Sequence, residues 1–87
     1  MTYIVEVAPA AGRQIRKLDR ETQRRIVARL AELEDEPRPQ DVKKLQGEED
    51  LYRVRVGDYR IVYQIVDRRL LVLVLKVGHR REIYRGR

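Results

Sequence analysis

Three arginines lie close together in the stretch LYRVRVGDYRIVY, from Leu51 to Tyr63, and their spacing suggests binding chemistry. The stretch alternates apolar and polar residues on both sides of Gly57-Asp58, which is typical of two strands joined by a two-residue turn with glycine first. Such a turn pairs Arg55 with Arg60. Like charges that face one another across a strand pair are destabilising, so the pairing calls for a compensating function.

Side chains alternate between the two faces of a strand, which separates the apolar residues of this hairpin from its arginines. One face holds the apolar set: Tyr52, Val54, Val56, Tyr59, Ile61, Tyr63 and Ile65. The opposite face holds Arg53, Arg55 and Arg60. Because a guanidinium matches a phosphate in a bidentate geometry, this cluster predicts an anion site. In the alternative interpretation, the long arginine stems lie along the sheet and place their charged heads in water.

The charge of the chain is concentrated in its second half. Residues 1–49 contain ten Lys/Arg and ten Asp/Glu, whereas residues 50–87 contain ten Lys/Arg and four Asp/Glu and carry the whole formal net charge of +6. This asymmetry favours an anionic partner for the second half. A solvated basic surface without a partner is the other interpretation.

The end of the chain, GHRREIYRGR, adds further basic side chains and one aromatic ring, namely His79, Arg80, Arg81, Tyr84 and Arg85. This composition suits single-stranded RNA, because a base can stack on the ring while arginines hold phosphates. Tyr84 could equally complete the core, and His79 could be a solvated loop residue. Lys43 and Lys44 either extend the basic surface or keep a loop soluble.

Composition restricts the class of protein. With 43% hydrophobic and 39% charged residues, the 87-residue chain is expected to fold as one soluble domain over residues 1–87. It has no cysteine and one histidine, which argues against zinc-thiolate and multi-histidine metal sites. The longest apolar run, Leu70–Leu75, is too short to span a bilayer. We therefore expect a cytoplasmic protein with no membrane association, no metal and no cofactor.

The first half of the chain predicts one strand and two helices. Thr2–Ala8 is β-branched and alternating, and Pro9 should end it. A short helix is expected over Ala10–Leu18, and a longer one from Arg20 to about Asp35 with Asp19 as its N-cap. The apolar stripe of the longer helix is predicted to consist of Ile26, Val27, Leu30 and Leu33.

The segment EPRPQD should end the longer helix and begin a loop that runs to about Asp50, in which VKKLQG forms either a turn or the start of a strand. Three strands follow, over Leu51–Val56, Tyr59–Val66 and Leu70–Val77, the last ended by Gly78. Short connections between consecutive strands favour antiparallel pairing. The predicted fold is α+β with the order β-αα-βββ, a small antiparallel sheet with a helical hairpin packed on one face.

Taken together, LYRVRVGDYRIVYQI, the apolar strand after it and the downstream VGHRREIY resemble the RelE/ParE superfamily of toxins from prokaryotic toxin–antitoxin systems. The resemblance covers nearly the whole chain and is strongest from Lys44 to Tyr84. DEPRPQDVKKLQG also resembles the usual connection between helix and strand in that family.

The RelE branch of this superfamily consists of messenger-RNA interferases, many of which cut mRNA in the ribosomal A site. The resemblance implies metal-independent attack of a ribose 2′-OH on the neighbouring phosphate, leaving a cyclic phosphate and a 5′-OH. It also implies a cognate antitoxin protein that neutralises the site. The catalytic positions of the family fall on Arg53, Arg55, Arg60, Arg80 and Tyr84, and RNA binding is expected to extend to Lys43, Lys44, Arg81 and Arg85.

The sequence departs from some relatives at Arg53 and Arg55, where those relatives have lysine. A lysine can lose its proton, whereas an arginine cannot act as a base in practice. These two positions are therefore expected to stabilise the charged phosphorane. The proton transfer is predicted for His79, whose unperturbed pKa suits it, with Tyr84 and Glu82 as less natural candidates.

Two other functions are compatible with the sequence. One is a ParE-like toxin that inhibits DNA gyrase and has no nuclease activity. The other is a non-catalytic nucleic-acid-binding protein that acts only as a co-repressor with its antitoxin, because binding a phosphate needs the same residue types as phosphate chemistry.

Overall fold

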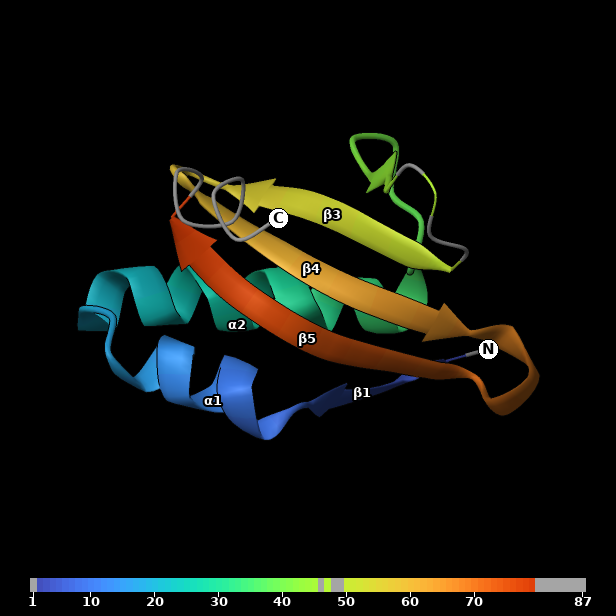
Figure 1. Cartoon of the computed structure of the whole chain (residues 1–87), viewed down its shortest axis with the longest axis horizontal. Helices are drawn as coiled ribbons and strands as arrows, with labels where there is room; N and C mark the ends of the chain where they lie inside the picture. The colour runs from blue at the N-terminus through green and yellow to red at the C-terminus, as the bar shows by residue number, and fades with distance from the viewer. Residues whose placement is uncertain (1, 46, 48–49, 80–87) are drawn as a thin grey trace.

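A five-stranded sheet with both helices on one of its faces forms the body of the protein (Figure 1). The computed structural model describes residues 2–45, 47 and 50–79. Within these residues the strand order is β1-β5-β4-β3-β2. The elements are β1 (Ile4–Val7), α1 (Pro9–Arg16), α2 (Arg20–Asp35), β2 (Lys43–Lys44), β3 (Leu51–Val56), β4 (Tyr59–Val66), the short 3₁₀ turn Asp67–Arg69, and β5 (Leu71–His79).

The hairpin of β3 and β4 has the register that the sequence predicts. Val56 pairs with Tyr59 and Arg55 pairs with Arg60 across the two-residue turn. Gly57, the first turn residue, has a positive φ of 58°, which glycine adopts without strain. The predicted hairpin is therefore confirmed.

The direction of β1 differs from the prediction. Strands β2 to β5 pair antiparallel, but β1 pairs parallel with β5, with Ile4 opposite Leu71. The prediction of an antiparallel sheet is wrong at this edge, because the rule behind it applies to strands joined by short connections. The chain between β1 and β5 includes both helices and three other strands, so no short connection sets their relative direction.

The core lies between the helices and the apolar face of the sheet. From α2 it includes Ile26, Leu30 and Leu33, and from the sheet Tyr52, Val54, Val56, Ile61, Tyr63, Ile65, Val72, Val74 and Val77. The predicted apolar face of the hairpin is thus confirmed, with Tyr59 half-buried at its end. Val27 was predicted to belong to the helix stripe, but it is 58% exposed. One residue after Ile26, it lies about 100° further around the helix and points away from the sheet.

Polar contacts fix the helices at their ends. Asp19 caps α2 by accepting a hydrogen bond from the Thr22 amide at 3.1 Å, which confirms the predicted N-cap. The Gln14 side chain accepts a hydrogen bond from the Val77 amide at 2.7 Å and so connects α1 to β5.

No helix in the described part of the chain is long and apolar enough to cross a bilayer.

Two arginines hold the long connection between α2 and β3. Arg29 of α2 forms an ion pair with Asp41, while Arg38 binds Asp67 at 2.9 Å and donates to the Tyr52 hydroxyl at 3.1 Å. Hydrogen bonds from Arg38 and Tyr3 lower the pKa of Asp67 to about 2. The connection includes the two-residue strand β2, so VKKLQG contains the start of a strand.

Strand β5 is longer than predicted. It continues through Gly78 to His79, and Gly78 pairs with Arg60 of β4. Glycine weakens a strand without ending it when both neighbours stay paired. The predicted end at Val77 is therefore wrong by two residues.

Candidate active site

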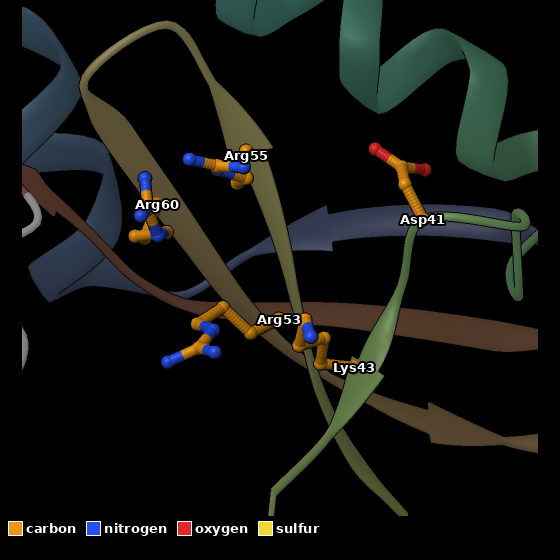
Figure 2. A pocket seen from close by; sticks show the side chains of 5 residues that line it. All are labelled: Asp41, Lys43, Arg53, Arg55 and Arg60. Atoms are coloured by element: carbon orange, nitrogen blue, oxygen red, sulfur yellow. The ribbon is translucent and has the colours of Figure 1, made fainter.

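A hollow of about 250 Å³ collects the arginines of the hairpin. Its lining, which we call the arginine hollow, consists of Asp41, Lys43, Arg53, Arg55 and Arg60. Figure 2 shows the three arginine side chains on the same side of the β3–β4 hairpin, with Lys43 and Asp41 on the neighbouring segment. The lining of the arginine hollow therefore combines four cations with one carboxylate.

Strand alternation places these side chains together. Arg53 and Arg55 alternate with the buried residues Tyr52, Val54 and Val56, so they point away from the helices. Arg60 is the direct partner of Arg55, and Lys43 of β2 is the direct partner of Arg53. The hollow thus forms on the sheet face that the helices do not cover.

The three arginines differ in burial. Arg60 is only 6% exposed, Arg53 is half-buried and Arg55 is exposed. The Arg60 side chain donates one long hydrogen bond of 3.4 Å to the Tyr59 carbonyl oxygen. Among the described residues no carboxylate forms an ion pair with Arg60 or Arg55. Because burying an unpaired charge is costly, this arrangement favours a bound anion.

Asp41 is the residue of the hollow that sequence reasoning missed. It lies in a proline-interrupted loop, where no periodicity indicates which way a side chain points. Hydrogen bonding to Arg29 lowers the pKa of the Asp41 carboxyl, and the nearby charge of Arg55 contributes to the decrease. Burial tends to lower the pKa of Arg29, but its hydrogen bonds to Asp41 and Glu32 outweigh this and raise it. Asp41 is therefore a fixed negative charge at the rim of a positive site.

His79 does not line the arginine hollow. It is the direct partner of Tyr59, whereas Gly78 is the partner of Arg60, so alternation places the His79 side chain on the opposite face from Arg60. Its ring meets the Tyr59 ring edge to face, with centroids 5.7 Å apart. It lines a separate hollow with Gln14 of α1 and with Lys17, the residue after α1. This position gives no support to the prediction that His79 moves the proton.

The remaining predicted site residues divide into two groups. Lys44 is the partner of Tyr52, on the face that the helices cover, and it does not line the arginine hollow. The others lie outside the described residues: Arg80, Arg81, Glu82, Tyr84 and Arg85. In the described ranges, no group of three or more His, Asp or Glu side chains is placed to hold a metal ion.

The chemistry available in the hollow is the binding and neutralisation of an oxyanion. Guanidinium groups present several donors in a fixed plane and keep their charge at any physiological pH. The burial of Arg60 reduces screening by water, so its interaction with an anion is stronger than at an exposed position. None of the three arginines can accept a proton.

Comparisons with known proteins identify the family. The protein-family model for the ParE toxin of the type II toxin–antitoxin system parDE matches residues 5–84 of this chain. The mRNA interferase toxin RelE of Escherichia coli K12 is 32% identical over 88 residues, covering 97% of this chain and 92% of that protein.

Solved structures give the same result. RelE in the archaeal RelE–RelB complex of Pyrococcus horikoshii is 35% identical with a TM-score of 0.82, covering 92% of this chain and 97% of that one. The intact Escherichia coli RelBE toxin–antitoxin complex contains a chain that is 30% identical with a TM-score of 0.79, covering 88% of this chain and 95% of that one. The fold, the family model and these relatives agree, and the chain belongs to the RelE/ParE superfamily of type II toxins.

Proposed function

We propose that this protein is the toxin of a toxin–antitoxin pair and an endoribonuclease that cleaves mRNA. The observation that carries the proposal is the cluster of Arg53, Arg55 and Arg60 around one hollow, with Arg60 nearly buried. The similarity to proteins named RelE mRNA interferase, at 32% identity over almost the whole chain, supports it. The proposed reaction is attack of a ribose 2′-OH on the adjacent phosphate, without a metal.

In this reaction the arginines stabilise developing negative charge. As the 2′-oxygen adds to phosphorus, the phosphate gains charge on its equatorial oxygens, and donors already in place lower the barrier. Arg60 is fixed by burial, so it loses little entropy in holding the transition state. Arg53 and the exposed Arg55 approach the same space from β3 and hold the substrate phosphate.

Proton transfer requires a group other than these arginines. Asp41 lies in the hollow, but its lowered pKa makes it a weak base. His79 lies on the opposite sheet face. We therefore assign Arg53, Arg55 and Arg60 to charge stabilisation alone, and the predictions for Tyr84 and Glu82 still await a test.

The proposed partners are a cognate antitoxin and translated mRNA in the ribosomal A site. Several structurally similar RelE chains were solved in complexes with RelB antitoxins, which supports the first partner. The basic lining of the hollow supports the second. A substrate on the ribosome places the action of the protein in the cytoplasm.

A second candidate function is inhibition of DNA gyrase, which the family model named after the ParE toxin favours. Expression of the protein without an antitoxin separates the candidates. An mRNA interferase should arrest growth and translation, with cuts that map inside codons of translated mRNA. Filamentous cells with damaged DNA and intact mRNA would support gyrase inhibition and refute the RNase. If expression is harmless, both toxin functions are excluded and a nucleic-acid-binding co-repressor remains as the candidate function.

A further inference from the structure

A second hollow adjoins the first one at the edge of the sheet. It has a volume of about 410 Å³, and we call it the α2 groove. Its charged lining and its turn residue are Arg25, Arg29, Glu32, Asp41, Arg55 and Gly57. Asp41 and Arg55 line both hollows. The groove is therefore a continuation of the arginine hollow toward α2.

The short length of β2 leaves this passage uncovered by a neighbouring strand. Strand β2 pairs only with Tyr52 and Arg53, so the end of β3 from Val54 to Val56 has no described strand beside it on that edge. The α2 groove runs over this edge, from Val56 and Gly57 to the side chains of α2. A chain molecule bound at the arginines could follow it without passing over another strand.

Arg25 of α2 lies directly over the hairpin turn. A Cβ atom at Gly57 would be 3.3 Å and 3.4 Å from the two terminal nitrogens of Arg25. The glycine that the turn requires for its positive φ therefore also provides the space in which the Arg25 guanidinium lies. Few other residues adopt this conformation at low cost.

The charges in the α2 groove are not equivalent. Arg29 forms ion pairs with both Glu32 and Asp41, and its side chain is only 18% exposed. Arg24, the residue before Arg25, forms an ion pair with Glu21, with 3.9 Å between its terminal nitrogen and the Glu21 carboxylate oxygen. Within the described residues no ion pair or hydrogen bond involves the Arg25 side chain, and no ion pair involves Arg55. These two arginines are the cations of the groove that an external anion can bind.

We propose that the α2 groove binds single-stranded RNA next to the nucleotide in the arginine hollow, with a flanking phosphate held between Arg25 and Arg55. The inference rests on the proposed function, which supplies RNA as the substrate class. The groove suits a nucleotide better than a lone phosphate, because Glu32 and Asp41 can accept hydrogen bonds from base amino groups. Arg55 then contacts the RNA chain in both hollows.

Binding of RNA oligonucleotides that cannot be cleaved tests this proposal with the full-length protein. Oligonucleotides with 2′-O-methyl groups at every position and of increasing length are titrated at several salt concentrations. For a long oligonucleotide, Arg25→Ala should weaken binding about fivefold. It should also reduce the slope of log affinity against log salt by about 0.7, the value for one phosphate of a single strand. A trinucleotide should bind the wild type and this variant equally.

Arg24→Ala provides a matched control. It removes the same charge from the neighbouring position of the same helix, but Arg24 does not line the groove. Its salt slope should equal that of the wild type, and Arg25→Lys should recover part of the affinity. The proposal is overturned if Arg24→Ala and Arg25→Ala weaken binding equally, if Arg25→Ala changes nothing, or if the wild type does not bind the oligonucleotides.

Cleavage of unmodified mRNA on translating ribosomes is measured separately and distinguishes the two proposals. Arg25-dependent binding without any cleavage would refute the proposed nuclease and retain the RNA groove. Cleavage together with binding that does not depend on Arg25 would refute the groove alone.

Discussion

Arg55 and Arg60 are direct partners across the β3–β4 hairpin, and no carboxylate in the described ranges forms an ion pair with either one. The pairing places two positive charges side by side on the sheet face that the helices do not cover. It is unfavourable for the free protein and favourable for a complex with an anion, because a phosphate between the two groups replaces repulsion with attraction. The Arg55–Arg60 pair therefore lowers the stability of the free fold and increases its affinity for an anion.

Arg60 should matter most for the rate of RNA cleavage. Because it is nearly buried and lines the arginine hollow, Arg60→Ala is expected to lower the single-turnover rate on the order of 10²-fold. Arg60→Lys keeps the charge but loses the planar guanidinium group, so its single-turnover rate should lie between those of the wild type and Arg60→Ala. Arg69→Ala, which removes an exposed arginine in the turn after β4, serves as the control. An unchanged rate in Arg60→Ala, with the fold intact by circular dichroism, would remove Arg60 from the mechanism.

Arg55 should lower the thermal stability of the free protein and increase the stabilisation that phosphate provides. At low ionic strength Arg55→Ala relieves the repulsion with Arg60, and Tm should rise by about 2–5 °C. Added phosphate should raise the Tm of the wild type more than that of Arg55→Ala, because an anion that binds the native state stabilises it by mass action. Chloride at equal ionic strength is the reference. Equal responses to phosphate in both proteins would mean that Arg55 binds no anion.

The ion pair between Arg29 and Asp41 should give a pH-dependent stability. Asp41→Asn is expected to lower the free energy of unfolding at pH 7 by about 1 kcal/mol, since Asp41 is half exposed. The native pKa of Asp41 is lowered, so its contribution is complete above the unfolded value of about 3.9 and is lost as the pH falls through the lower native value. Urea unfolding of both proteins between pH 2 and pH 7 measures this difference.

Glu34→Gln removes an exposed carboxylate of α2 that forms no ion pair within the described residues, and it serves as the control for Asp41. A pH-independent difference between wild type and Asp41→Asn would show that Asp41 acts through packing and not through its charge.

Two apolar positions on α2 should respond differently to truncation. Leu33 is fully buried, so Leu33→Ala should cost about 2–5 kcal/mol of unfolding free energy. Val27 is 58% exposed, and Val27→Ala should change stability by no more than about 0.5 kcal/mol. Chemical denaturation measures both. A large loss at Val27 would indicate that this side chain is covered in solution.

The sequence predicts the hairpin and its arginine face well, because strict alternation permits a single register. It does not fix the parity of β5, where apolar residues point to both faces, and this is why His79 falls on the unexpected side of the sheet. Nor does it reveal Asp41 or Arg25. Asp41 lies in a loop without periodicity, and the position of Arg25 over Gly57 depends on how α2 is placed beside the sheet.

The parallel pairing of β1 with β5 has a consequence for synthesis on the ribosome. Residues 4–7 leave the exit tunnel well before their partners, residues 71–74, have emerged. The hairpin with its arginines is complete in sequence before β5 exists. The nascent toxin must therefore carry β1 without its partner until β5 has been translated, and this strand edge is open to misassembly during that time.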